Sequence, residues 1–231
     1  MAASSVDVEG LDLTGTVLRE RPDLVGRAVT LRRCDLTGAD LRRLDLGGWT
    51  FVECTAEGSD LTSTQLELSR WRGGSARGAR FTDADLTDAR FTDVDLADAG
   101  FGGATVTDAA FEGCRLMGAR FERSRGLGMN LTGCNLYAAH LDRATLTNTG
   151  LTRLRLTDAS LRGADLRGSD LSGSTLHGAD LTGAKMQGAD LSDAELGTVD
   201  LERLRALEGT TINAAQAAQI LYDVAGVVVL P

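Results

Sequence analysis

A large apolar residue recurs at every fifth position of this chain, and no other feature constrains its fold as strongly. The period runs from Leu31 to Leu201 without slipping. Of its 35 central positions, 23 are Leu and 6 are Phe, and only Ala56, Ala76 and Gly126 depart from the large apolar type. Gly126 at such a position predicts a local bulge. A tandem repeat this long is typical of an array in which each unit stacks on its neighbours.

A period of five matches neither of the regular secondary structures. A helix repeats every 3.6 residues and a strand every two, so neither would keep the apolar stripe on one side. The chain must therefore turn once per repeat. Gly, Asp and Asn near each central residue supply the necessary turn chemistry. We expect short extended pieces joined by tight turns and coiled into a solenoid.

The residue two before each centre is usually small, and the one just before it is often Asp, as in Ala164-Asp165-Leu166. This pattern in unbroken tandem resembles the pentapeptide-repeat family, and the likeness covers about three quarters of the chain. The resemblance implies an all-β solenoid, namely a right-handed, four-sided β-helix with four pentapeptides to a coil. The central residue and the small residue before it would point inward. Residues twenty apart would then stack.

Stacking at this interval predicts columns of like side chains inside the coil. One aromatic column would contain Phe51, Trp71, Phe91 and Phe111. A second, on the opposite side, would contain Phe81, Phe101 and Phe121. All four cysteines fall in one further column, at positions 34, 54, 114 and 134. Their regular placement favours small core residues over a redox function.

The two ends depart from the pattern and divide the chain into three parts. Val8 begins the same period in a shifted frame, with the slip around Arg21-Pro22-Asp23. We interpret residues 1–28 as an N-terminal cap with partial repeats, and residues 29–207 as the pentapeptide-repeat β-helix. Residues 208–231 form the third part.

A short C-terminal α-helical cap is predicted in that third part. Asn213 is a good N-cap residue, helix formers follow it, and Gly226 closes the segment. Residues 227–230 would add a short strand. This ending resembles the C-terminal module of family members that bind DNA gyrase, which implies a homodimer joined end to end. The predicted dimer interface contains Ile220, Leu221 and Val224, and a monomeric cap is the alternative.

Charge and composition exclude several classes of protein. The 33 acidic residues outnumber the 24 basic ones and give a formal net charge of -9, which argues against direct nucleic-acid binding. No apolar run approaches the roughly 20 residues that a membrane span needs. The start of the chain has neither the basic flank nor the apolar core of a signal peptide. We therefore expect a cytoplasmic protein without a membrane partner.

The sequence assembles no recognisable active site. His140 and His177 would fall on different sides and coils of the rod, so they form no catalytic pair. The chain contains no G-x-S-x-G elbow, P-loop, HExxH helix or EF-hand pattern. Cys and His do not cluster at zinc-site spacing. We predict that the protein is not an enzyme and requires neither a cofactor nor a metal.

The resemblance instead implies a function for the surface. In gyrase-binding members the rod imitates duplex DNA, occupies the DNA-binding saddle of the enzyme and protects it from quinolones or from a producer's own poison. We therefore expect a DNA-mimic protein that binds DNA gyrase or another type II topoisomerase and confers resistance to its inhibitors. The alternative is a structural scaffold rod with an unrelated partner.

Charge is banded along the chain, with acidic residues concentrated at 83–108 and 165–200 and arginines between them. A uniformly basic groove would bind the acidic bands selectively. The predicted partner-binding surface consists of Asp83, Asp85, Asp88, Asp93, Asp95, Asp98, Asp108, Asp165, Asp170, Asp180 and Asp190.

Overall fold

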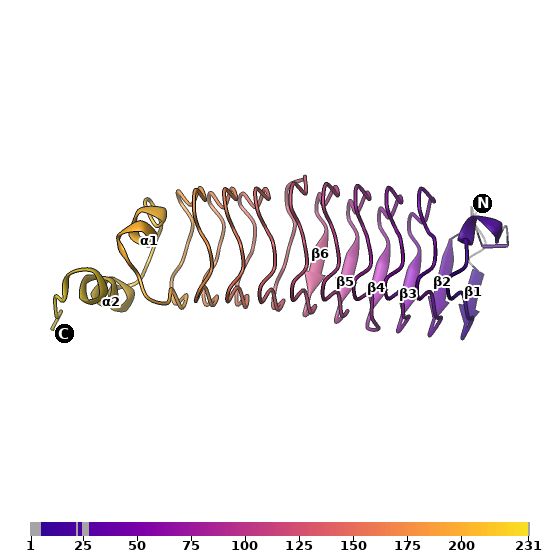
Figure 1. The fold of residues 1–231 in the computed structure, drawn as a ribbon, viewed down its shortest axis with the longest axis horizontal. Coiled ribbons are helices and arrows are strands. Elements are labelled where there is room, and N and C mark those ends of the chain that lie inside the picture. The colour runs from indigo at the N-terminus through magenta and orange to yellow at the C-terminus, as the bar shows by residue number, and fades with distance from the viewer. Residues whose placement is uncertain (1–5, 22, 25–27, 231) are drawn as a thin grey trace.

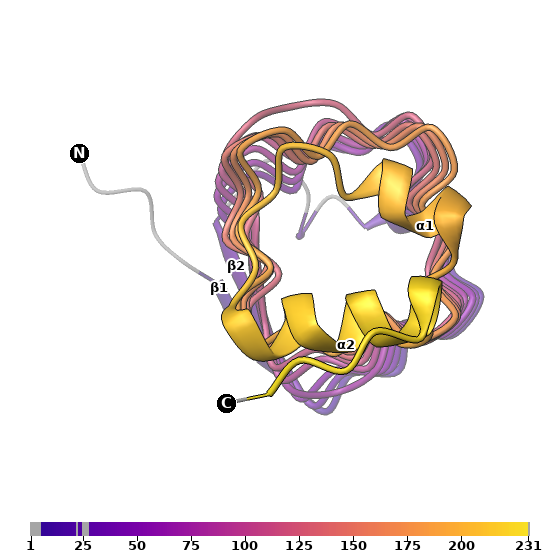
Figure 2. The same ribbon diagram turned by 90° about the vertical axis from the view of Figure 1, so that its left-hand side faces the viewer.

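The chain folds into a long rod in which successive coils stack along one axis (Figure 1), and Figure 2 shows the four sides of the rod end-on. The computed structural model describes residues 6–21, 23–24 and 28–230. Six short strands form one parallel sheet along one side, in chain order. They are β1 (Val6–Glu9), β2 (Val29–Arg32), β3 (Thr50–Val52), β4 (Arg70–Arg72), β5 (Arg90–Thr92) and β6 (Ala110–Glu112). Isolated parallel bridges join the coils on the other sides.

Residues twenty apart in the sequence lie side by side in neighbouring coils, so each coil contains four pentapeptides. Phe51 pairs with Trp71, and Trp71 pairs in turn with Phe91. The predicted four-sided β-solenoid is confirmed by this register.

The first coil is longer than the others. Val8 pairs with Leu31, an offset of 23 residues, which confirms the shifted frame at the N-terminal end. A 3-10 helix, η1 (Leu18–Glu20), lies within this coil. Residues 1–5, 22 and 25–27 of the predicted N-terminal cap lie outside the described residues.

Each corner of the coil is a tight turn. In a representative corner, the backbone N–H of Ala39 donates to the carbonyl oxygen of Leu36 at 3.0 Å, and Gly38 has a φ of 64°. The carboxylate of Asp35 accepts a hydrogen bond from the backbone N–H of Thr37 at 2.9 Å. An Asx turn of this kind stabilises the corner. The frequent Asp before each central residue therefore has a structural function.

Two columns of stacked aromatic rings fill the middle of the rod, as predicted. The rings of Phe51 and Trp71 stack with centroids 3.8 Å apart, and Phe91 continues that column. In the second column the rings of Phe81 and Phe101 stack at 4.9 Å. The columns meet edge to face, since the Phe81 and Phe91 centroids lie 6.0 Å apart with an interplanar angle of 90°. Aromatic rings favour this T-shaped geometry, so each column stabilises the other across the core.

The four cysteines are free and buried, at positions 34, 54, 114 and 134. The thiol of Cys54 donates to the carbonyl oxygen of Leu31 at 3.4 Å. Burial raises the pKa of the Cys54 thiol to about 11. A thiol with so high a pKa is protonated at neutral pH and is a poor nucleophile.

One boundary between coils lacks half of its backbone pairing. Bridges Arg115–Asn135 and Arg120–His140 join the two coils on two sides. Among the described residues, the corresponding bridges from 125 to 145 and from 130 to 150 are missing on the other two sides. We call this interruption the ladder break. Figure 1 shows a wider gap between coils shortly after β6.

The ladder break coincides with the glycine that replaces a core side chain. Gly126 has a φ of 124°, and a Cβ atom there would lie 2.5 Å from the backbone nitrogen of Thr107. The neighbouring Leu127 points outward and is 62% exposed. The bulge predicted at Gly126 is confirmed.

Two helices, α1 (Leu201–Ala206) and α2 (Ala214–Ala225), cover the C-terminal end of the rod (Figure 2). The predicted cap is confirmed for α2, which Asn213 opens with a capping box to Gln216. Gly226 ends it in the left-handed conformation.

Two C-terminal expectations are wrong. Leu201 is not a core residue: it begins α1 and is 65% exposed, because Asp200 caps that helix by accepting from the backbone N–H of Arg203 at 2.8 Å. Residues 227–230 form no strand. Thr211 already pairs with Asp190 in the last coil. This pairing occupies a backbone edge to which residues 227–230 could otherwise add as a strand.

Candidate partner-binding surfaces

Six of the predicted surface acids occupy the position just before a core residue, and there the carboxylate also holds the turn. Asp85 accepts from the backbone N–H of Thr87 at 3.0 Å, and Asp170 accepts from that of Ser172 at 2.9 Å. The same arrangement holds for Asp95, Asp165, Asp180 and Asp190.

Arginines further engage some of these carboxylates. The Arg167 guanidinium, with a 2.6 Å contact, lowers the pKa of Asp165 to about 2. Asp95 lies 3.5 Å from Arg77 and 3.9 Å from Arg115. Such acids present less free negative charge to a partner than their number in the sequence indicates.

The other five acids, Asp83, Asp88, Asp93, Asp98 and Asp108, lie at corners with positive φ. Asp93 shows their packing: a Cβ atom added to Gly113, one coil further on, would lie 2.6 Å from its Oδ1 atom. Asp83, Asp98 and Asp108 lie in the same way over Gly103, Gly118 and Gly128. These four corner aspartates and the glycines one coil further on are therefore matched pairs, whereas Asp88 has Asp108 at that position.

The rod distributes the predicted acids over all four sides, and only a few of them gather. Successive bridges Asp45–Gln65, Gln65–Asp85 and Asp85–Thr105 define one side. On it lie Asp85, Asp88 and Asp108, together with two acids that the sequence analysis missed, Asp45 and Glu67. We call these five residues the acidic face. No Arg or Lys occurs at the outward positions of this side between residues 45 and 108.

The acidic face spans three coil spacings, or about 14 Å at the roughly 4.8 Å separation of paired strands. Its two missed members could have been found by listing charges at intervals of twenty rather than along the chain. Asp95 and Asp98 lie on the opposite side of the rod, and the remaining predicted acids lie on other sides or beyond the ladder break. The predicted surface is thus not one continuous patch.

The predicted dimer residues do not share one exposed face. Ile220 is 7% exposed and Val224 packs against the core, so these two side chains close the end of their own chain. They lie four apart on α2, which places them on the same helix face. Leu221 is 46% exposed. The predicted joining face therefore needs correction, because most of it is already used as the cap.

Exposed apolar side chains are concentrated in the C-terminal segment that contains Leu221. The exposed large hydrophobic residues at this end are Leu201, Leu204, Leu221, Tyr222, Val227, Val228, Val229 and Leu230. Elsewhere in the described part of the chain, only Leu68, Leu127 and Tyr137 are large, apolar and exposed. We call the C-terminal set the apolar end patch. A concentration of this kind marks an interaction surface.

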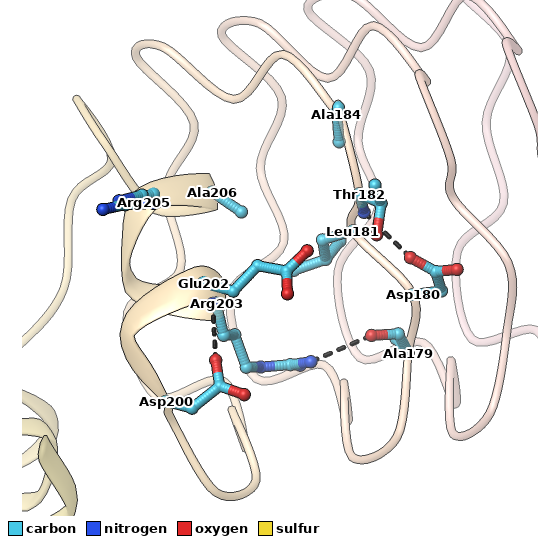
Figure 3. A pocket seen from close by; sticks show the side chains of 11 residues that line it. Ala179, Asp180, Leu181, Thr182, Ala184, Asp200, Glu202, Arg203, Arg205 and Ala206 are labelled. Carbon is cyan, nitrogen blue, oxygen red and sulfur yellow. Dashed lines mark hydrogen bonds between the residues drawn. The ribbon is translucent and has the colours of Figure 1, made fainter.

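A hollow of about 370 Å³ separates α1 from the last coils, and Figure 3 shows its lining. The Arg203 guanidinium crosses it and donates to the carbonyl oxygens of Leu176 at 2.6 Å and Ala179 at 2.9 Å. Burial lowers the pKa of Arg203. The side chain thereby supplies a donor to the Ala179 carbonyl, which no further coil reaches, and adds a second bond to the Leu176 carbonyl, which already accepts from the backbone N–H of Ala179. We therefore interpret the hollow as part of the end cap.

The described residues hold no group of three or more Cys, His, Asp and Glu side chains able to bind a metal ion. In the same part of the chain, no helix has the length and apolar character needed to cross a membrane.

Comparison with known proteins decides the family. A family model described as Pentapeptide repeat region matches residues 27–101, and one described as Pentapeptide repeats (8 copies) matches residues 130–168 and 159–197. The chain belongs to the pentapeptide-repeat family. The residues between these matches, 102–129, include Gly126, where the pentapeptide pattern loses its core side chain and the ladder break begins.

Solved pentapeptide-repeat structures resemble the whole rod. A trypsin-treated form of QnrB1, described as a plasmid-mediated fluoroquinolone resistance protein, is 26% identical with a TM-score of 0.64. That match covers 97% of this chain and 100% of the other. Full-length QnrB1 is 24% identical with a TM-score of 0.63, and the match covers 94% and 98% of the two chains. No curated protein matches the sequence.

Proposed function

We propose that this pentapeptide-repeat protein binds a type II topoisomerase such as DNA gyrase, without catalysis, and protects it from inhibitors. The observation that carries the proposal is the likeness to QnrB1, a fluoroquinolone resistance protein, along nearly the full length of both chains. We also propose a cytoplasmic location, where an enzyme that acts on DNA would be met.

We infer that the acidic face makes the contact with the enzyme as a partial imitation of DNA. Duplex DNA carries one negative charge per roughly 1.7 Å, or about eight charges over the 14 Å that this face spans. The face carries five carboxylates and no Arg or Lys at its own outward positions, and its one ion pair within the described chain is with Arg90, whose Nη2 lies 3.7 Å from Asp88. Arginines lie on the other sides and near the C-terminal half, so the imitation is confined to one stretch of the rod.

We further infer that two chains meet through the apolar end patch and double the length of the rod. The support is the clustering of exposed Leu, Tyr and Val residues at one end. Leu221 remains from the originally predicted interface, whereas Ile220 and Val224 serve the cap.

The experiment is a DNA gyrase supercoiling and cleavage assay with and without a fluoroquinolone. We expect the wild-type protein to reduce inhibitor-stabilised cleavage. The triple variant Glu67→Gln, Asp85→Asn, Asp88→Asn should lose this effect, because it removes three negative charges. The amides keep the size of the side chains and, at position 85, an oxygen that can accept the Asx hydrogen bond from Thr87. Asp98→Asn, on the opposite side and 69% exposed at its side chain, is the matched control.

Two results would decide against the proposal. If the wild-type protein leaves both supercoiling and cleavage unchanged at micromolar concentration, it does not act on gyrase, and a scaffold with another partner becomes the better reading. If the triple variant protects as well as the wild type, the acidic face is not the contact surface.

A further inference from the structure

Two strands of the sheet place arginines directly against one another on the outer surface. β4 and β5 pair in parallel, with Arg70 opposite Arg90 and Arg72 opposite Thr92. Paired strands lie only about 4.8 Å apart. Like charges at directly opposite positions destabilise a sheet. The pairing of Arg70 with Arg90 therefore destabilises the sheet at this place. It also concentrates positive charge on a protein whose net charge is -9.

Nearby carboxylates neutralise little of this positive charge. Within the described chain, the guanidinium groups of Arg70 and Arg72 form no ion pair and no hydrogen bond. Arginines elsewhere on the rod do find partners, as Arg80 does with Asp60 at 2.9 Å and Arg167 does with Asp165. Other arginines, such as Arg153, also lack an ion pair in the described chain, so the feature particular to β4 is the direct pairing of Arg70 with Arg90, with Arg72 beside them.

Arg90 is held in place by backbone groups. One of its guanidinium nitrogens, Nη1, donates to the carbonyl oxygen of Asp108 at 2.6 Å and to that of Ala89 at 3.2 Å. Its Nη2 lies 3.7 Å from the Asp88 carboxylate. The remaining N–H groups stay available, on a side chain whose position is already fixed.

The three arginines border a surface hollow of about 210 Å³ over β4, β5 and β6. Thr92 and the small Ala110 leave room in it, and Glu112 lines it as well. Arg70, Arg72 and Arg90 outnumber this one carboxylate. We call the hollow the arginine groove.

We propose that the arginine groove is a binding site for a compact oxyanion, a phosphate group in particular. A phosphate dianion can accept charge-assisted hydrogen bonds from guanidiniums on two adjacent strands at once, and guanidinium matches its oxygen geometry. Its charge relieves the repulsion between Arg70 and Arg90. The overall negative charge of the protein disfavours a long polyanion and favours a small group. The groove borders the acidic face at Arg90, whose Nη2 lies 3.7 Å from Asp88, so the test changes only Arg70 and Arg72, which form no ion pair or hydrogen bond within the described chain.

The test is a calorimetric titration of the full-length protein with inorganic phosphate against sodium chloride at equal ionic strength. Glycerol phosphate, as a monoester, and a short DNA duplex are the other two titrants. We expect saturable binding of phosphate and of the monoester, and no binding of the duplex at the groove. In the Arg70→Gln, Arg72→Gln double variant, affinity should fall by about tenfold or more, because both guanidiniums that would donate charge-assisted hydrogen bonds to the phosphate are removed.

Arg153→Gln is the matched control, since Arg153 is likewise exposed and unpaired among the described residues but lies away from the groove. Its phosphate affinity should equal that of the wild type. Circular dichroism checks that both variants keep the fold. We expect the fold to be retained, because the substituted arginines point outward and do not pack in the core. The proposal would be overturned if phosphate does not bind, or if its binding does not saturate. It would also be overturned if the double variant binds phosphate as tightly as the wild type does, or if only the DNA duplex binds.

Discussion

The Asp93 side chain occupies the space directly beside Gly113 in the next coil, where a Cβ atom would lie 2.6 Å from Oδ1. Gly113 also has a φ of 63°. Gly113→Ala therefore adds a collision to backbone strain, and we expect it to lower the free energy of unfolding by about 1–3 kcal/mol. Denaturant unfolding monitored by circular dichroism measures the change.

Gly38→Ala is the control for that substitution. Gly38 has nearly the same φ, 64°, but nothing lies within 4 Å of an added Cβ atom. It should show the backbone strain alone, and thus the smaller loss. Adding Asp93→Ala to Gly113→Ala should recover part of the loss. Equal losses at both glycines, with no recovery, would contradict the matched-pair interpretation.

The two aromatic columns should make the centre of the rod sensitive to truncation. Phe91 stacks on Phe111 at 4.8 Å and meets Phe81 edge to face. Phe91→Ala would remove both contacts and leave a cavity, so we expect a loss of about 3–5 kcal/mol in unfolding free energy. Phe91→Leu should cost less. A loss below about 1 kcal/mol for the alanine variant would show that the columns are not the stabilising core.

The ladder break should be visible in hydrogen exchange. The backbone N–H groups of Gly128, Leu131 and Thr145 form no backbone hydrogen bond within the described structure, whereas those of Ala110 and Arg115 do. We expect the first group to exchange markedly faster under native conditions, because exchange there needs no coil separation. Mass spectrometry of peptides from both regions measures this. Uniform protection across 105–150 would contradict it.

Stability at low pH should depend on the pair Asp165–Arg167. Hydrogen bonding from Arg167 lowers the pKa of Asp165 in the folded protein to about 2, against roughly 3.9 for an unfolded Asp. The folded state thus gains stability above pH 4 and loses it as pH falls from about 4 to 2. Arg167→Gln should lower Tm at pH 6 but leave it nearly equal to wild type at pH 2. A difference that does not vary with pH would refute the assignment.

The apolar end patch should determine the oligomeric state. The double variant Leu221→Asp, Tyr222→Ser changes two exposed side chains, 46% and 58% exposed, and leaves Ile220 in the cap. We expect wild-type protein to scatter light as a dimer and this variant as a monomer. Truncation before α2 is a poorer test because it also uncovers the core. A wild-type monomer at high concentration would rule out end-to-end joining through this patch.

The repeat made the solenoid, its twenty-residue register and its aromatic columns predictable, because one physical rule, the burial of every fifth side chain, acts at each step. The start and end of α2 were predictable for a local reason, since Asn213 and Gly226 carry cap geometry in their own chemistry. Leu201 was misassigned because it satisfies both the five-residue period and the start of a helix, and the capping bond from Asp200 decided between them.

The surface was less predictable than the core. Asp83, Asp93 and Asp98 are close together in the sequence, but the coiling of the chain places them on different sides of the rod. Asp45 and Glu67 are sparse along the sequence, yet they belong to the same face as Asp85. Proximity on this rod follows intervals of twenty, so a charge density computed along the chain identifies the wrong neighbours.

The interruption at Gly126 gives the rod an uneven stiffness. The coils before it and after it are each tied together on every side, whereas the two bodies are joined to each other by backbone pairing on two adjacent sides only. Bending should therefore concentrate at that one joint and proceed in one preferred direction. The acidic face lies before this joint and the apolar end patch lies after it. A partner bound at the acidic face and a partner bound at the apolar end patch therefore need not lie on one straight axis.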